Sequence, residues 1–170
     1  MWKNKCVSDL YEPGSVFKLI TASVALEEHV TTPDVEGDFV CNGYEQVADK
    51  KISCWSTVPH GSLSLRKALE KSCNPALMQL GKRIGVSTLY KYYRAYGLFD
   101  TTGSKLYGES NSLFTKESSV ADVELATMSF GQRLNITPLQ MITAISAIAN
   151  DGVLMKPMIV DKITNTDTGA

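Results

Sequence analysis

Apolar residues recur with helical spacing along most of this chain, which is 170 residues long. The first such stretch predicts a helix over residues 15–29, with Val16, Ile20 and Val24 along one stripe. The same spacing predicts shorter helices over residues 65–71, 75–84, 87–96 and 120–128. The pattern therefore indicates a mainly helical chain.

The strongest helical signal covers residues 138–150. Thr137 is a suitable N-cap, Pro138 fits the first helical position, and Gly152 follows the last turn. Its apolar stripe consists of Ile142, Ile145 and Ile148. Residues 153–164 are then expected to be extended, and the expected strand residues are Ile159, Val160 and Ile163.

Two polar stretches separate the helices, over residues 31–61 and 101–119. The first is rich in glycine, proline and acidic residues, with short alternating segments and no long apolar period. Loops of this length in a compact domain are usually functional or held by something. The stretch at 31–61 is therefore a candidate for a bound ligand or metal.

Composition fits part of a water-soluble domain, with 44% hydrophobic and 21% charged residues. A formal net charge of -1 offers no electrostatic case for binding nucleic acid or an anionic membrane surface. The sequence contains no apolar run of about 18 residues and no signal-peptide pattern at its start. We therefore expect a soluble piece without a membrane anchor.

The first candidate chemistry is the pair Ser15 and Lys18, directly after the turn signal Pro13-Gly14. Residues three apart share a helix face, so a desolvated, neutral Lys18 amine could take the proton of the Ser15 hydroxyl. The alternative is a helix-capping serine followed by a solvated lysine. Ser64 and Lys67 have the same spacing, and there a plain N-cap is expected.

The second candidate is Ser72-Cys73-Asn74, followed by Pro75, the only Ser-x-Asn in the chain. Ser72 or Asn74 could serve as an N-cap, with Pro75 at the first helical position. Such a turn could also project a hydroxyl and an amide into a cleft. Cys73, between them, is expected to point into the core and to have no catalytic role.

Ser-x-x-Lys followed by Ser-x-Asn resembles the penicillin-binding proteins and serine β-lactamases, whose third motif is Lys-Thr-Gly on a strand. Other stretches narrow the resemblance: Tyr-Glu-Pro-Gly-Ser at 11–15, Ser-Phe-Gly-Gln at 129–132, and Thr-Pro-Leu-Gln at 137–140, leading into 148–152. Together they resemble the transpeptidase domain of a class B, monofunctional penicillin-binding protein, of the clostridial elongation or sporulation type.

This resemblance implies that residues 1–170 are a partial transpeptidase domain, with an insert at 31–61 and an extended segment at 153–170. The implied fold is the helical part of the α+β transpeptidase fold, with most of its antiparallel sheet missing. An apolar face left uncovered on the first and last helices would then favour association. The sequence has no Lys-Thr-Gly, and the nearest stretch is Asp167-Thr168-Gly169. We therefore expect the chain to stop before that motif and to be inactive alone.

The resemblance also implies a mechanism and a place in the cell. Ser15 would be acylated by the D-Ala-D-Ala terminus of a peptidoglycan stem peptide or by a β-lactam, and Lys18 would be the base. Ser72 would relay a proton, and Asn74 would hold the substrate amide and the Lys18 side chain. The parent protein would be anchored at the extracytoplasmic face of the bacterial membrane.

A candidate metal site lies within the stretch at 31–61, where Cys41, Cys54 and His60 are spaced as Cys-x12-Cys-x5-His. With Asp49 as a fourth ligand, or Asp38 in its place, thiolate, imidazole and carboxylate suit tetrahedral zinc. Some clostridial members of the class are expected to hold zinc in this way. A disulfide between the two cysteines, or free buried thiols, are the alternatives.

Two functions from other classes remain open. A class D β-lactamase or β-lactam sensor has a similar first motif, but its second motif usually ends in valine where this chain has Asn74. A non-catalytic interaction module organised by zinc is the other alternative. Turnover of a β-lactam would favour the first alternative, and metal binding without penicillin labelling would favour the second.

Overall fold

The computed structural model describes residues 3–162 and 164–167. Its helices are α1 (Lys5–Ser8), the 3-10 turn η1 (Gly14–Phe17), α2 (Lys18–Glu27), α3 (Leu65–Glu70), α4 (Asn74–Ile84), α5 (Val86–Ala95), the 3-10 turn η2 (Glu117–Ser119), α6 (Asp122–Met128) and α7 (Pro138–Ala149). Its strands are β1 (Phe39–Cys41), β2 (Tyr44–Val47), β3 (Lys50–Ser53) and β4 (Gly61–Leu63). The prediction of a mainly helical chain is confirmed.

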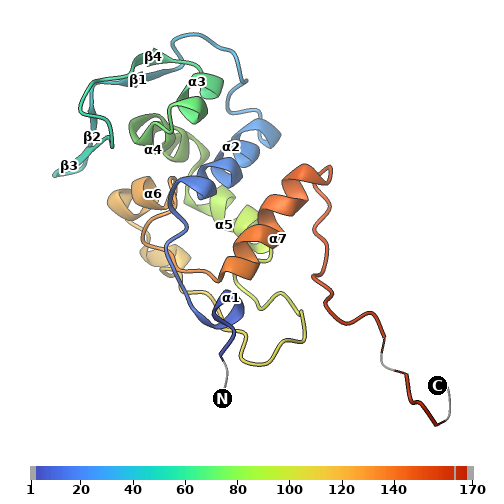
Figure 1. Ribbon diagram of the computed structural model, residues 1–170. Helices are drawn as coiled ribbons and strands as arrows, with labels where there is room; N and C mark the ends of the chain where they lie inside the picture. The colour runs from blue at the N-terminus through green and yellow to red at the C-terminus, as the bar shows by residue number, and fades with distance from the viewer. Residues whose placement is uncertain (1–2, 163, 168–170) are drawn as a thin grey trace.

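Helix α2 lies at the centre of the helical cluster, between α4 and α7 (Figure 1). Helix α4 packs in turn against α5 and α6, and the strands lie at one end of the cluster over α3 and α4. The core includes side chains from each of these helices, among them Phe17, Ile20, Leu77, Leu80, Tyr93 and Met141. The segments with Ser15 and Ser72 both begin helices of this core.

Residues 31–61 were predicted to be a loop, but much of this stretch forms β-structure. Strand β1 pairs antiparallel with β4, and β2 pairs antiparallel with β3 through the turn at Ala48 and Asp49. Each strand is three or four residues long. A strand this short shows too few alternations for periodicity to reveal it.

The predicted helix at 15–29 begins with η1, and its α-helical part begins only at Lys18. Val16, expected on the buried stripe, is 50% exposed, so that part of the prediction is wrong. The buried side chains on this segment include Phe17, Ile20 and Val24. A 3-10 turn has three residues per turn instead of 3.6, and this difference rotates Val16 away from the α-helical stripe.

Helix α7 begins as predicted, and its core-facing side differs from the predicted stripe. Thr137 is the N-cap, Pro138 occupies the first turn, and the side chain of Gln140 completes a capping box. The buried face consists of Gln140, Met141, Ala144 and Ala147. Ile142 and Ile148 of the predicted stripe are 58% and 36% exposed.

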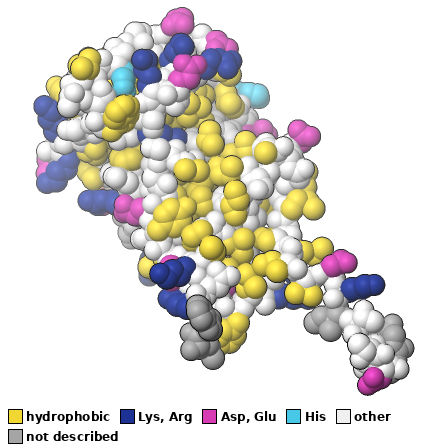
Figure 2. Space-filling view, viewed as in Figure 1, with side chains coloured by type: hydrophobic (Ala, Val, Ile, Leu, Met, Phe, Trp, Pro, Cys, Tyr) yellow, Lys and Arg dark blue, Asp and Glu magenta, His cyan; other side chains and the backbone are white. Residues whose placement is uncertain are grey.

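An apolar patch therefore lies over η1, α2 and α7. Its exposed members include Val16, Leu19, Leu26, Ile142 and Ile148. Figure 2 shows hydrophobic side chains gathered at the centre of the view, where Figure 1 places these elements. This patch is the uncovered apolar face expected from the sequence.

After α7 the chain runs away from the helical cluster (Figure 1). Residues 153–162 form no strand, and Ile159 and Val160 are 61% and 62% exposed, so their prediction as strand residues is wrong. An extended segment becomes a strand only where a neighbouring strand accepts its hydrogen bonds, and the described residues place none beside it. Ile163, Thr168 and Gly169 lie outside the described residues. Among the described helices, none has the length and apolar character needed to cross a membrane.

Candidate active site

Ser15 lies in the exposed 3-10 turn η1, and Lys18 is the first residue of α2. The Lys18 Nζ lies 3.3 Å from the Ser15 Oγ. The pairing expected from the spacing of three residues is therefore present. The alternative of a solvated lysine is excluded, because Lys18 is only 2% exposed.

The Ser72–Asn74 turn supplies the other partners of Lys18. The Lys18 Nζ donates to the Ser72 carbonyl oxygen at 2.7 Å, to the Ser72 Oγ at 2.8 Å, and to the Asn74 Oδ1 at 2.7 Å. The Ser72 hydroxyl in turn donates to the Ser15 Oγ at 3.0 Å. Four residues named from the sequence, Ser15, Lys18, Ser72 and Asn74, thus form one hydrogen-bonded group.

Burial gives the Lys18 amine an unusual acidity. Desolvation by burial is the largest cause, and it lowers the pKa of Lys18 to about 8 from 10.5. At pH 7 about one Lys18 in eleven is then neutral, against about one in three thousand at a pKa of 10.5. A neutral amine 3.3 Å from a serine hydroxyl can accept its proton.

The conformation of the Ser72–Asn74 turn explains how neighbouring residues face different surroundings. Ser72 has a φ of 47°, in the left-handed region, and Cys73 returns to an extended backbone as the N-cap of α4. No side chain caps this helix and its N-cap is Cys73, so the alternative that Ser72 or Asn74 serves as the N-cap is excluded. Their polar groups point to Lys18 instead, whereas Cys73 is fully buried.

A second cluster lies directly behind this turn. The ligand atoms of Cys41, Cys54, His60 and Cys73 all lie within 4.8 Å of one another. The three cysteines are buried and His60 is half-buried, with its Nδ1 3.8 Å from the Cys54 Sγ. Cys41 and Cys54 are free thiols, so the structure does not contain the alternative disulfide.

The two β-ladders bring the three ligands of the 31–61 stretch together. Cys41 ends β1, and its pairing with Gly61 on β4 places it beside His60. Cys54 follows β3, and its backbone N–H donates to the Gly43 carbonyl oxygen at 2.8 Å. The long insert is therefore folded around these side chains.

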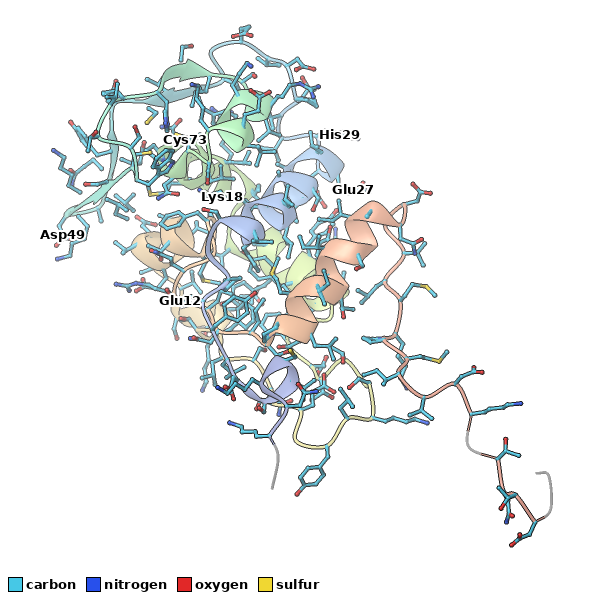
Figure 3. The ribbon with its side chains drawn as sticks, in the orientation of Figure 1. Glu12, Lys18, Glu27, His29, Asp49 and Cys73 are labelled. Atoms are coloured by element: carbon cyan, nitrogen blue, oxygen red, sulfur yellow. The ribbon has the colours of Figure 1, made fainter. Side chains whose placement is uncertain are left out.

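Asp49 was predicted as the fourth ligand, and the structure places it elsewhere. It lies at the tip of the β2–β3 hairpin, 76% exposed and paired with Lys50 at 3.2 Å, and Figure 3 shows it far from Cys73. Asp38, the substitute, is paired with Arg83 at 2.6 Å. The fourth donor beside Cys41, Cys54 and His60 is Cys73, which is buried in the core as the sequence predicts but was not expected among the candidate ligands. The sequence feature that could have indicated Cys73 is a cysteine within the Ser-x-Asn motif, close in sequence to an insert that contains two more cysteines.

The donor set fits a tetrahedral metal ion. Three sulfurs and one imidazole nitrogen suit zinc, whose bonds of about 2.3 Å to sulfur and about 2.0 Å to nitrogen require donors roughly 3.5 to 4 Å apart. Burial alone would raise the pKa of Cys41, but backbone N–H groups of His60 and Gly43 donate to its sulfur and lower it. Burial raises the pKa of Cys73. In the metal-free cluster, Cys41 is therefore the thiol that ionises more readily of these two.

Comparison with known proteins agrees with the fold and with the family expected from the sequence. A family model for the penicillin binding protein transpeptidase domain matches residues 1–169. Stage V sporulation protein D of Bacillus subtilis is 36% identical over 166 residues, covering 95% of this chain and 26% of that protein. Peptidoglycan D,D-transpeptidase FtsI of Escherichia coli is 29% identical over 164 residues, covering 95% of this chain and 26% of that protein.

Solved structures give the same result. Penicillin binding protein 3 from Mycobacterium tuberculosis, in its apo form, matches with a TM-score of 0.89 at 31% identity, covering 100% of this chain and 37% of that chain. Crystal structures of that protein in complex with aztreonam and with ampicillin match similarly. This chain spans about a quarter of the length of the curated relatives named above. With its helical fold and its motifs in order, the chain belongs to the penicillin-binding protein transpeptidase family, and its relatives are class B members.

Proposed function

We propose that this chain carries the nucleophile and base of a D,D-transpeptidase that crosslinks peptidoglycan stem peptides. The observation that carries the proposal is the Lys18 amine, buried and within hydrogen-bond distance of Ser15, Ser72 and Asn74. Family membership and relatives named as peptidoglycan D,D-transpeptidases support the substrate class.

In the proposed acylation step, the Ser15 Oγ attacks the carbonyl carbon of the penultimate D-Ala, and neutral Lys18 takes the hydroxyl proton. The tetrahedral intermediate then collapses, the peptide C–N bond breaks, and the terminal D-Ala leaves. Ser72 lies 2.8 Å from the Lys18 Nζ and 3.0 Å from the Ser15 Oγ, so it can relay the proton to the leaving nitrogen. An amine of a second stem peptide then attacks the acyl-enzyme and completes the crosslink.

Asn74 has a different part in this proposal. Its Oδ1 accepts from the Lys18 Nζ at 2.7 Å, which holds the amine toward Ser15 and Ser72. The amide NH₂ of Asn74 remains available to donate to a carbonyl oxygen of the substrate. Asn74 therefore orients the base and the substrate together.

A β-lactam would acylate Ser15 in the same way, because its strained amide presents a carbonyl carbon to the nucleophile. The ring nitrogen stays covalently attached after the C–N bond breaks, so the leaving group cannot diffuse away. The aztreonam and ampicillin complexes of the mycobacterial structure support this class of ligand. We further propose that the protein works at the extracytoplasmic face of the bacterial membrane, where stem peptides are crosslinked.

Full activity is expected to need a Lys-Thr-Gly strand, which these 170 residues do not contain. In the family this strand carries one of the two backbone N–H groups of the oxyanion hole, and Ser15 carries the other. Losing one such donor typically costs about a hundredfold to a thousandfold in rate. We therefore expect the isolated 170-residue chain to acylate at least about a hundredfold more slowly than a protein that includes this strand.

We also propose that Cys41, Cys54, His60 and Cys73 hold a structural zinc ion. The closed set of four ligands leaves no open position for substrate, so the ion would supply folding energy and no catalytic step. It would join the β-ladders of residues 31–61 to the N-terminus of α4.

Labelling with a fluorescent penicillin tests the assignment of Ser15, in the full-length protein that carries this sequence. Ser15→Ala is expected to abolish the covalent label. Ser64→Ala is the matched control, because Ser64 has the same spacing to Lys67 and caps α3 with its side chain. Label that survives Ser15→Ala, or requires Ser64, would refute the proposal. Rapid turnover of the adduct would favour a β-lactamase, and zinc binding without label would favour an interaction module.

A further inference from the structure

The turn that follows α6, formed by Ser129, Phe130 and Gly131, contacts both η1, which carries Ser15, and α4, which begins at Asn74. All three residues are buried. The hydrogen bonds of the Lys18 amine go to Ser15, Ser72 and Asn74, and not to this turn. The contacts of this turn nevertheless reach both the segment with Ser15 and the helix that begins at Asn74.

On the side of the nucleophile, two hydrogen bonds join the turn to η1 and α2. The Gly14 backbone N–H, directly before Ser15, donates to the Gly131 carbonyl oxygen at 2.8 Å. The Thr21 hydroxyl, one turn beyond Lys18, donates to the Ser129 carbonyl oxygen at 2.9 Å. Thr21 and Ser129 are both fully buried, so water cannot replace this bond.

The approach of the two backbones leaves no space for a side chain at Gly131. A Cβ atom there would lie 2.2 Å from the Gly14 carbonyl oxygen and 2.7 Å from the Phe17 Cβ. Gly131 also has a φ of +84°, which L-residues rarely adopt. Any side chain must therefore push η1, and Ser15 with it, away from the turn.

The same turn is also packed against α4, through Ser129 and Gly81. A Cβ atom at Gly81 would lie 1.7 Å from the Ser129 Oγ and 2.7 Å from its Cβ. The Ser129 hydroxyl donates to the Leu125 carbonyl oxygen at 2.7 Å, which holds it in that position. Glycine at 81 thus allows α4 to approach the turn closely.

We propose that the Ser129–Gly131 turn is a spacer that sets the separation between Ser15 and the Ser72–Asn74 pair, with Gly131 and Gly81 as positioning residues. Packing on one side of the turn fixes η1, and packing on the other side fixes α4. The Ser15 to Ser72 hydrogen bond of 3.0 Å depends on both. A displacement of about 1 Å at such a site can cost about a hundredfold in rate.

The test compares Gly131→Ala with Gly85→Ala in the full-length protein. Gly85 has a φ of +83°, nearly that of Gly131, but a Cβ atom there has no neighbour within 4 Å. Both variants place an alanine at a positive φ, and only at position 131 does the added Cβ meet η1. Penicillin acylation is resolved into the dissociation constant of the first complex and the acylation rate constant k2, and the melting temperature is measured beside them.

Gly131→Ala is expected to lower k2 by about tenfold to a hundredfold. Gly85→Ala is expected to retain the wild-type k2, whatever its effect on the melting temperature. A merely structural role for Gly131 would lower the melting temperature in both variants and leave k2 of the folded protein unchanged. A wild-type k2 in folded Gly131→Ala overturns the inference.

Thr21 provides a second route in case Gly131→Ala does not fold. Thr21→Val keeps the shape and removes the donor to the Ser129 carbonyl oxygen, whereas Thr21→Ser keeps the donor. We expect k2 to fall about threefold to tenfold in Thr21→Val and to be retained in Thr21→Ser. Equal k2 values in the two variants count against the spacer.

The inference rests on the proposed function, and a crystal structure of the variant distinguishes a failure of the spacer from a failure of the proposed function. Labelling of wild-type protein at Ser15 reports on the function itself. The distance between the Ser15 and Ser72 Oγ atoms in the Gly131→Ala variant, or in Thr21→Val, reports on the spacer even without labelling. A separation beyond hydrogen-bond reach, about 3.5 Å, supports the spacer, and an unchanged 3.0 Å refutes it.

Discussion

The acylation rate of Ser15 should follow the titration of Lys18. Burial lowers the pKa of Lys18 to about 8, so the fraction of neutral amine rises from about one in a hundred at pH 6 to about one half at pH 8. If neutral Lys18 is the base, the rate constant k2 should rise about fiftyfold over this range and reach a plateau above pH 9. At a pKa of 10.5 the same rate would still be climbing tenfold per pH unit at pH 9.

The assay is stopped-flow or quenched labelling with a fluorescent penicillin, at closely spaced pH values between about 6 and 9.5. Lys18→Arg should lose acylation throughout, because a guanidinium does not deprotonate in this range. Lys67→Arg is the matched control from the second Ser-x-x-Lys, and it should keep the wild-type profile because Lys67 is exposed and paired with Glu70. A profile independent of pH would refute the role of Lys18 as the base, and a rate still climbing tenfold per pH unit at pH 9 would refute its lowered pKa.

The same shift has a consequence for stability, whose sign follows from proton binding. The folded state lowers the pKa of Lys18, so between about pH 8 and 10.5 the unfolded chain binds more protons than the folded one. The contribution of Lys18 to the free energy of unfolding therefore rises with pH across that window. The burial penalty, on the order of 3 kcal/mol, is fully present below about pH 8. Urea unfolding of wild-type protein and of Lys18→Met at pH 7 and pH 10 measures this difference.

Three further predictions concern the metal, the core and a helix cap. The chain should bind one zinc ion by elemental analysis; Cys73→Ser should lower that content, and Asp49→Asn should not, because Asp49 lies at an exposed hairpin tip. Loss of zinc in Asp49→Asn, and not in Cys73→Ser, would favour the ligand set predicted from the sequence, with Asp49 as the fourth ligand. Leu77→Ala should lower the free energy of unfolding in urea by about 2 to 5 kcal/mol, because Leu77 is fully buried. Ile142→Ala should change it by less than about 0.5 kcal/mol, because Ile142 is exposed. Thr137→Ala should cost about 1 kcal/mol by removing the capping box of α7, and an unchanged unfolding midpoint would contradict that role.

The residues of the candidate active site could be named from the sequence because they belong to short motifs. Ser15 and Lys18 are three residues apart, and any helical turn brings such residues to one face. Ser72 and Asn74 belong to one short segment at the start of α4, where Asn74 is the first helical residue and Pro75 the second. The order of the motifs predicted that Ser72 and Asn74 lie beside Lys18, and the hydrogen bonds of the Lys18 Nζ confirm that they do.

The candidate metal cluster could be predicted from the sequence only in part. Cys41, Cys54 and His60 belong to one stretch of sequence, so their grouping could be anticipated. The fourth ligand depends on where β2 and β3 turn: the hairpin carries Asp49 outward, and the packing of β1 against α4 brings Cys73 to the cluster instead. Spacing along the chain contains no information about this choice.

The sequence by itself determined the main helical segments, where α7 begins, and the pairing of Ser15 with Lys18, because these features depend on interactions between near neighbours. The order of the motifs indicated that Ser72 and Asn74 belong with this pair, and their contacts with Lys18, 54 and 56 residues away in the chain, are formed by the tertiary structure. Only the tertiary structure decided that Val16 faces solvent and that Cys73 joins the thiol cluster. It also decided that Gly131 allows η1, and Gly81 allows α4, to approach the Ser129–Gly131 turn closely. Those outcomes depend on the distances between segments far apart in the chain. Such distances are set by the packing of whole elements, which no short pattern of residues encodes.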